Sequence, residues 1–550
     1  MLGVFRKYYQ PGALFISTFT IASIFSALGV DPHHHGIMFK PAFDVAHGHM
    51  LFRDTFTQYG ALTTLLQAWA LQLFGDYLLV IQIQTAFFYG LISLCLYYIW
   101  LKILPRWLTI ISVVIWLLLA PYYRTLMPFV PWSSVPALLF QMLSLLLVLD
   151  ALSKKSHIIM MLAGGLAVLT FWCRQPVGVF HCASLFFFLT TIPLITGQSW
   201  KEAMIDCAFF VTGVIVASLP FFAWLTLNGA LTDMYLQSIK AAIFFGTTTY
   251  QTESYSLFVN ILMALLAYEE KISHFYTPWS ILPLICLCLL FILVVKRWRD
   301  RDSIKSHLPL YGLLLVSVAS WMQYYPVPCL RHLYWAATPM IGVFSYGVWK
   351  LCEWLFAKQK KLQVIIICIV LTFIFKDQID AGIFNGSIKL SILKTKIEAP
   401  MVLRGMYTTS VSAVKYKEID RSFRDAIMKN SYLLNLTSDA LYLTFIGPQK
   451  NFHPMYIDWG KYNDFIYPDF QKQRSAFIKG AKPLLLSIEG EDIPDWNCIE
   501  VFDMVTERKR SFGYGQSHKL ALYGFPGSSN TYGCYDISTA EGNLMNKQYY

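Results

Sequence analysis

The chain has 550 residues, of which 56% are hydrophobic and only 14% charged, and its formal net charge at pH 7 is +11. Soluble proteins usually carry about 25% charged residues. This composition therefore excludes an ordinary soluble enzyme, a disordered protein and a nucleic-acid-binding protein. The excess of basic residues lies among the apolar runs of residues 1–377, where it reports membrane topology rather than an anionic partner.

Apolar runs alternate with short polar breaks through residues 11–375, and each is close to the roughly 20 residues that cross a bilayer as a helix. We predict eleven membrane-spanning helices; because several runs are short, ten or twelve also fit the pattern. The apolar residues 61–75 predict an interfacial or re-entrant helix, and residues 227–277 predict amphipathic helices on the membrane surface. The predicted spans are 11–30, 77–101, 107–121, 134–151, 157–173, 177–195, 204–226, 279–296, 308–323, 333–351 and 362–376.

Most of the loop lysines and arginines fall on one set of alternating loops, which begins with Arg6 and Lys7. By the positive-inside rule this set is cytoplasmic, so the N-terminus is cytoplasmic and an odd number of spans places the C-terminus outside. We interpret the first run as an uncleaved helix, since it is too long for the apolar core of a signal peptide. The expected location is the bacterial inner membrane.

The chain divides into a multi-spanning part, residues 1–376, and a compact extracytoplasmic α/β domain, residues 377–550. Cys498 and Cys534 both fall in the second part, where an exported compartment allows either a disulfide or two separate thiols. In this domain we predict a helix over 413–429 and strands over 441–445, 484–488, 499–504 and 520–524.

The first outer loop, residues 31–76, carries the densest polar chemistry. Asp31 directly follows the first span, and a carboxyl group partly deprived of water there has a raised pKa that suits a general base. The alternative is that Asp31 only ends the helix beside Pro32. Arg53 and Asp54 form either a local ion pair or a phosphate-binding arginine oriented by its neighbour.

Three consecutive histidines, His33, His34 and His35, raise the question of a metal site. Adjacent residues on a helix or strand point in different directions, so three in a row seldom converge on one ion. We assign no metal ligands and expect one or two of these side chains to bind a substrate oxygen, while the others face water. A divalent cation held with help from Asp31, Asp44 and Asp54 is the alternative.

Arginines recur on other outer loops: Arg124, Arg174 and Arg331 all face the same side as Asp31 in this topology. Cations at membrane depth usually have a partner or a function, and the guanidinium fork matches phosphate oxygens. The sequence thus predicts a pocket for an anionic lipid head, although snorkelling toward lipid headgroups is the simpler explanation for any one arginine. The other predicted substrate-binding residues are His33, His34, Arg53, Gln58, Tyr59, Tyr325 and His332.

This layout resembles the GT-C glycosyltransferases, integral membrane enzymes that use polyprenyl-phosphate sugars. The segments D-P-H-H-H-G, P-A-F-D-V, F-R-D-T-F-T-Q-Y-G, Q-Y-Y-P and R-H-L-Y-W look like the bacterial branch related to protein mannosyltransferases and the aminoarabinose transferase. The resemblance covers most of residues 1–376. It implies that Asp31 is the base, that Asp54 is a second acid, and that Arg331 and Arg174 meet the lipid phosphate. Many relatives have two adjacent acids, whereas Pro32 follows Asp31 here, so the choice between the two acids stays open.

The implied reaction moves a sugar from a polyprenyl-phosphate donor to a glycan, lipid or protein acceptor outside the membrane. Arginines neutralise the leaving phosphate while Asp31 takes a proton from the attacking acceptor. No nucleotide site or nucleic-acid partner is needed. Two other classes remain open: a lipid-linked sugar transporter, and a polysaccharide polymerase or ligase. Replacing Asp31 separates them, since only an enzyme should lose turnover while still binding lipid.

Overall fold

The computed structural model describes residues 2–120, 129–244, 257–269, 274–275, 278–299, 307–324, 330–427, 433–436, 439–448, 451–457, 461–481, 484–488, 497–504 and 518–524.

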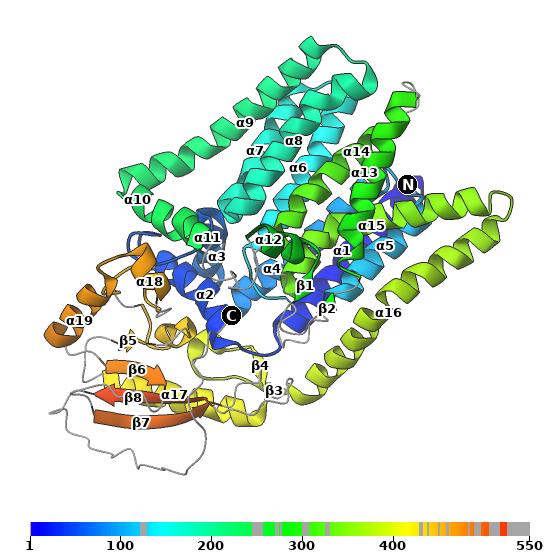
Figure 1. Ribbon diagram of the computed structural model, residues 1–550. Helices are drawn as coiled ribbons and strands as arrows, with labels where there is room; N and C mark the ends of the chain where they lie inside the picture. Colours follow the sequence, from blue (N-terminus) through cyan, green and yellow to red (C-terminus); the bar gives the residue numbers. More distant parts are fainter. Residues whose placement is uncertain are drawn as a thin grey trace.

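A bundle of long helices makes up most of the molecule (Figure 1). Every one of the eleven predicted apolar runs forms a helix of this bundle. Those helices are α1 (Leu2–Ser26), α4 (Leu78–Trp100), α5 (Arg106–Leu119), α6 (Ser134–Lys154), α7 (His157–Cys173), α8 (Gln175–Thr196), α9 (Trp200–Leu227), α13 (Ile281–Arg299), α14 (Leu308–Ser320), α15 (Leu330–Leu355) and α16 (Lys360–Ile392).

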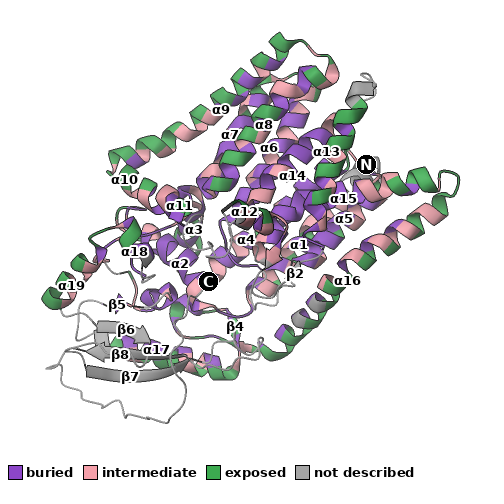
Figure 2. Ribbon diagram, viewed as in Figure 1, coloured by how far each residue is buried: buried purple, intermediate pink, exposed green. Residues whose placement is uncertain are grey.

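Among the described helices, five are long and apolar enough to cross a membrane: α4, α6, α8, α9 and α16. A bilayer favours such helices because each satisfies its backbone hydrogen bonds internally. The protein is therefore a multi-pass membrane protein, whereas the count of eleven spans and the orientation stay predictions. Green exposed positions line α9 and α16 in Figure 2. The exposed residues of these two helices include large apolar ones such as Phe222 and Phe373.

Close backbone packing holds α7 against α9. A Cβ atom on Gly164 would lie 2.0 Å from the Phe210 carbonyl oxygen, and one on Gly213 would lie 1.8 Å from the Met161 carbonyl oxygen. Only glycine fits at both positions. Small residues at a membrane helix contact allow this approach, which gains van der Waals packing.

The predicted first outer loop is largely helical. It contains α2 (Pro32–Ala46), which the sequence analysis did not predict, and α3 (Ala61–Phe74), which agrees with the helix expected over 61–75. The described part of the outer segment after α9, where the sequence predicted amphipathic helices, forms short elements. They are α10 (Leu231–Met234), the π-helix η1 (Tyr235–Lys240), α11 (Ala241–Phe244), α12 (Leu257–Leu265), and the paired β1 (Tyr268–Glu269) and β2 (His274–Phe275). A further short element, the 3₁₀ helix η5 (Trp321–Tyr324), directly follows α14.

The C-terminal residues pack against one end of the bundle, beside α2 (Figure 1). Their main sheet has the strand order β5-β6-β8-β7, with β5 parallel to β6 and the other pairs antiparallel. The elements are β3 (Thr395–Lys396), η6 (Met401–Leu403), β4 (Tyr407–Thr408), α17 (Ser410–Ile427), β5 (Leu433–Asn435), η7 (Ala440–Thr444), α18 (Lys461–Ile466), α19 (Phe470–Ala481), β6 (Leu484–Ile488), β7 (Asn497–Met504) and β8 (His518–Gly524).

Three of the four predicted strands and the predicted helix are present in this region. The strand predicted over 441–445 is wrong, because these residues form the 3₁₀ helix η7, which packs along α2. Short apolar runs do not distinguish a strand from a buried helical turn. The helix α16 also runs past the predicted boundary at residue 376, so the two-domain division stays a prediction.

Candidate active site

Asp31 is the N-cap of α2. Its backbone is extended, and its Oδ1 accepts hydrogen bonds from the backbone N–H groups of His33 (3.0 Å) and His34 (2.9 Å). Aspartate followed by proline is a favoured way to begin a helix, because the carboxylate satisfies free N–H groups and proline needs no hydrogen-bond acceptor. The local sequence thus fixes the Asp31 carboxylate at the positive end of α2.

A chain of side chains leads from Asp31 through His34 to Arg331. Oδ2 of Asp31 lies 2.9 Å from Nδ1 of His34, and Nη2 of Arg331 lies 3.0 Å from Nε2 of the same ring. Because a guanidinium group can only donate, Nε2 accepts, and the ring proton is on Nδ1, which donates to Asp31. Burial lowers the pKa of His34 to about 3; Asp31 opposes this shift and Arg331 adds to it. The ring is therefore neutral.

His35 has the opposite tautomer. The backbone N–H of Asp31 donates to its Nδ1 at 3.1 Å, so the ring proton is on Nε2. The side-chain amide of Gln82 on α4 lies 2.7 Å from Nε2, and its oxygen takes the position facing this N–H, since an amide nitrogen cannot accept. Burial lowers the pKa of His35 to about 4. His34 and His35 are both buried and His33 is half-buried, so the expectation that the remaining histidines face water is wrong for His35.

Trp132 lies at the centre of the predicted binding residues. Its ring is 5.7 Å from the His34 ring and 5.3 Å from the Tyr59 ring, and the Arg331 guanidinium lies 5.5 Å from its centroid. The Arg174 guanidinium lies 5.8 Å from the Tyr59 centroid, and both guanidinium distances fall within the range of cation–π attraction. Two arginines thus flank two aromatic side chains that pack edge to face.

This group unites predicted residues from distant parts of the chain. Gln58 joins it by donating a hydrogen bond to the Tyr59 hydroxyl at 2.7 Å. Arg174 is the single extended residue between α7 and α8, where Pro176 begins the next helix. Arg331 lies in the first turn of α15.

Sequence reasoning missed Trp132. The sequence feature that could have indicated it is its position: Trp132 follows Pro131 just before the predicted span 134–151, on the outer side of the membrane. The segment is firmly held: the Gln67 side chain on α3 donates to the Pro131 carbonyl at 2.7 Å, and Phe129 packs edge-on against Tyr89. Trp132 is only 7% exposed, and within the described residues its indole N–H has no hydrogen-bond partner.

Arg53 and Asp54 form the local ion pair. Nε and Nη2 of Arg53 donate to the two carboxylate oxygens at 2.8 and 2.9 Å, and Asp54 also accepts from the Met50 backbone N–H. These hydrogen bonds, with Arg53 the largest cause, lower the pKa of Asp54. Arg53 is exposed and also donates to the Asn228 carbonyl. Asp31, rather than Asp54, is the acid bonded to the group around Trp132.

The remaining predicted site residues have mixed positions. His332 is half-buried on α15, with its ring 6.1 Å from Trp335. Arg124 and Tyr325 lie outside the described residues, as does Cys534. In the part of the chain that the structure describes, no group of three or more His, Cys, Asp or Glu side chains could hold a metal ion.

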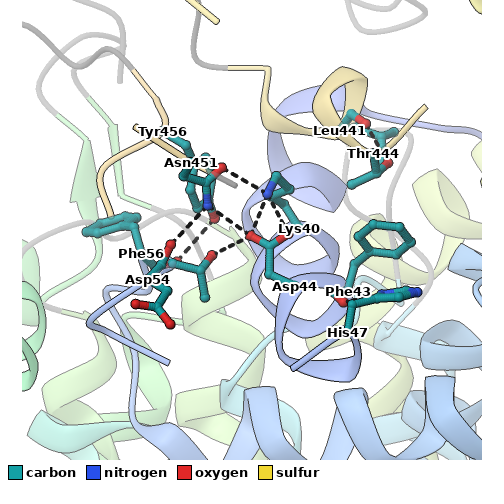
Figure 3. A network of polar contacts seen from close by, with 11 residues as sticks. Lys40, Phe43, Asp44, His47, Asp54, Phe56, Leu441, Thr444, Asn451 and Tyr456 are labelled. Carbon is teal, nitrogen blue, oxygen red and sulfur yellow. Dashed lines mark hydrogen bonds and ion pairs between the residues drawn. The ribbon is translucent and has the colours of Figure 1, made fainter. Parts of the chain in front are cut away.

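A second, buried network fixes α2 to its surroundings (Figure 3). Lys40 forms an ion pair with Asp44, which also accepts hydrogen bonds from Thr55 (2.7 Å) and Asn451 (3.2 Å). Asn451 in turn donates to the Asp54 carbonyl at 3.0 Å. Burial lowers the pKa of Lys40, and Asp44 opposes that shift. The network ties α2, the loop that precedes Gln58 and the C-terminal region into one unit.

No protein-family model matches the sequence, and no curated protein sequence matches it significantly. Solved structures do match. The apo oligosaccharyltransferase of Archaeoglobus fulgidus has a TM-score of 0.51 at 12% identity, covering 88% of this chain and 70% of the other. The oligosaccharyltransferase AglB of the same organism, in complex with an inhibitory peptide and a dolichol-phosphate, has a TM-score of 0.50 at 12% identity, with the same coverage.

At this identity the likeness concerns the fold. The chain folds like these oligosaccharyltransferases, which agrees with the helical membrane fold that the resemblance in its sequence implied.

Proposed function

We propose that the protein is a membrane glycosyltransferase that moves a sugar from a polyprenyl-phosphate donor to an envelope acceptor outside the membrane. The observation that carries the proposal is the Asp31–His34–Arg331 chain, which joins an acid, a base and a cation beside Trp132. Such a set suits a reaction in which an anionic group leaves while an acceptor loses a proton.

The two arginines supply the site for the donor phosphate. Arg331 and Arg174 flank the Trp132–Tyr59 pair, and a guanidinium group matches two phosphate oxygens at once. Neutralising the phosphate makes it a better leaving group. The dolichol-phosphate bound by AglB is a lipid phosphate of the same chemical class.

Asp31 provides the proton-accepting function. An acceptor hydroxyl or amine loses its proton as it attacks the anomeric carbon, and attack opposite the leaving phosphate inverts that centre. We place this chemistry at the outer face of a bacterial inner membrane, with the N-terminus cytoplasmic. The transferred group is a hexose or a pentose, and the acceptor is lipopolysaccharide, another glycan or a protein.

The composition of the envelope glycans tests this proposal directly. Mass spectrometry would compare the deletion strain with strains restored by the native gene, by Asp31→Asn and by Asp150→Asn. Asp150 is the matched control, since it pairs with Lys154 at the far end of α6. We expect one sugar mass to vanish on deletion and to return with the native and Asp150→Asn genes only, at equal protein levels.

Full restoration by Asp31→Asn would contradict the role of Asp31 and favour a transporter. No lost sugar mass in the deletion strain would contradict glycosyl transfer itself. The same membranes, assayed with and without EDTA, show whether a divalent cation takes part.

A further inference from the structure

We propose that the acceptor's proton enters at Nε2 of His34, and that Arg331 withholds this atom until a donor phosphate draws the guanidinium away. Asp31 then acts as the positioning residue that holds the ring. This inference rests on the proposed function and changes one assignment in it: the group that accepts the proton is His34 instead of Asp31.

The hydrogen bonds of Asp31 favour His34 as the proton acceptor. Oδ1 accepts from two backbone N–H groups and Oδ2 accepts from the His34 ring. Both carboxylate oxygens are thus occupied by donors within α2. The carboxylate is placed to orient the imidazole and to stabilise an imidazolium, the role that a buried aspartate has beside a catalytic histidine.

His34 has one lone pair left for a proton, on Nε2. In the structure Arg331 donates to that lone pair at 3.0 Å, so the atom is blocked. The charged or titratable groups that face His34 are Asp31 and His33 from its own segment and Arg331 from α15, while Trp132 is neutral. Of these, Arg331 is the cation that opposes protonation most strongly.

The Arg331 side chain has few interactions that hold it at His34. It is half-buried, and within the described residues no carboxylate forms an ion pair with it; its contacts are the His34 nitrogen and the Trp132 ring. A partly buried guanidinium with neutral partners has much to gain from an anion. A phosphate at Trp132 would compete directly with Nε2 for the same N–H groups.

The proposed step balances. The donor phosphate accepts hydrogen bonds from Arg331, which releases Nε2. The acceptor O–H then gives its proton to Nε2 while its oxygen bonds to the anomeric carbon. The bond from that carbon to the phosphate oxygen breaks, and its electron pair stays on the phosphate beside Arg331. His34 becomes an imidazolium next to Asp31 and afterwards returns its proton to water.

The test uses the full-length protein in lipid vesicles, with the polyprenyl-phosphate sugar that the glycan comparison identifies. His34→Gln should bind a polyprenyl phosphate within about threefold of native affinity, yet lose about 100-fold or more in kcat. His157→Gln is the matched control, since His157 lies at the start of α7, half exposed and close to Asp206. A His34→Gln enzyme with kcat within threefold of native would overturn the proposal.

A second measurement needs no variant. The pH dependence of kcat/KM reports the pKa values of the free enzyme, and that of kcat reports those of the donor complex. The two rate constants should therefore begin to fall at different acid pH values. In the free enzyme His34 is deprotonated down to about pH 3, so kcat/KM should stay flat through the mildly acid range. In the complex Arg331 has moved and no longer opposes protonation of His34, so kcat should begin to fall at a higher pH than kcat/KM does.

If kcat and kcat/KM of the native enzyme fall at the same acid pH, the proposal is overturned, even if His34→Gln fails to fold. An active His34→Gln with an inactive Asp31→Asn would assign the base to Asp31 and leave the proposed function intact. If the native protein consumes no donor at all, the proposed function itself fails, which is a separate result.

Discussion

At the scale of single residues, Asp31 controls two histidines in opposite ways. Its carboxylate accepts a hydrogen bond from the Nδ1–H of His34, while its backbone N–H donates to Nδ1 of His35. One ring therefore presents a bare Nε2 toward Arg331, and the other presents an N–H toward Gln82. Asp31→Asn would offer an amide N–H to His34, which favours the wrong tautomer and removes the lone pair at Nε2.

The lowered pKa values of His34 and His35 predict acid sensitivity. Both rings are neutral in the folded protein, with pKa values of about 3 and about 4, but the unfolded chain binds protons near pH 6.5. Unfolding therefore takes up protons below pH 6.5, and stability falls as the pH falls. We expect a loss of about 1.4 kcal/mol per pH unit for each ring between pH 6 and 4.

Thermal unfolding of the detergent-solubilised protein from pH 7 to 4 measures this effect. The Tm should decline steadily over that range, and His35→Gln should reduce the slope. A Tm that does not change with pH down to 4 would contradict neutral buried rings.

These residue-scale features could be predicted only in part. The sequence indicated Asp31, His34, Arg174 and Arg331 because polar residues beside apolar runs are conspicuous. It could not indicate which acid meets which cation. Trp132 went unnoticed, since an aromatic residue at a membrane boundary is common.

At the scale of elements, α2 carries the site. Its first residues hold Asp31 and His34, its middle packs along η7, and its last turns contain the Lys40–Asp44 pair. Gly36 allows the helix to lie directly on η7, because a Cβ atom there would be 2.3 Å from the backbone nitrogen of Leu441.

Adding a methyl group at that contact should separate the two elements. We predict that Gly36→Ala destabilises the protein by about 1–3 kcal/mol, the usual cost of overpacking, and lowers its Tm. Gly12→Ala is the matched control: it is also a helical glycine, and a Cβ atom there has nothing within 4 Å. It should be neutral or stabilising by up to about 1 kcal/mol. Equal Tm values for the two variants would show that α2 and η7 do not pack this closely.

The helices of the bundle were predictable because hydrophobic runs of spanning length have few other structures open to them. The unpredicted helix α2 did carry a signal, an aspartate followed by proline at a helix start. The sequence analysis considered the three histidines only as metal ligands or substrate-binding residues, and not as the first turn of a helix. The 3₁₀ helix η7 had no local signal, since its shape follows from packing against α2.

At the scale of the whole molecule, the site depends on contacts across the chain. Arg331 reaches a histidine 297 positions earlier in the sequence, and Asn451 reaches Asp44 across 407 positions. The C-terminal region shares a buried core with α2 through residues such as Phe39 and Tyr442. No periodicity in the sequence predicts such pairings, so the assembly of the site could only come from the structure.

The central claim is that this assembly consumes a lipid-phosphate sugar, and the release of polyprenyl phosphate measures it most directly. The purified protein would be placed in vesicles with the lipid-linked sugars of its own membranes and an acceptor fraction. We predict steady release by the native protein and at least a 100-fold slower release by Asp31→Asn, with Asp150→Asn equal to native. Equal release by the Asp31→Asn and native proteins, or no release by the native protein, would contradict the claim.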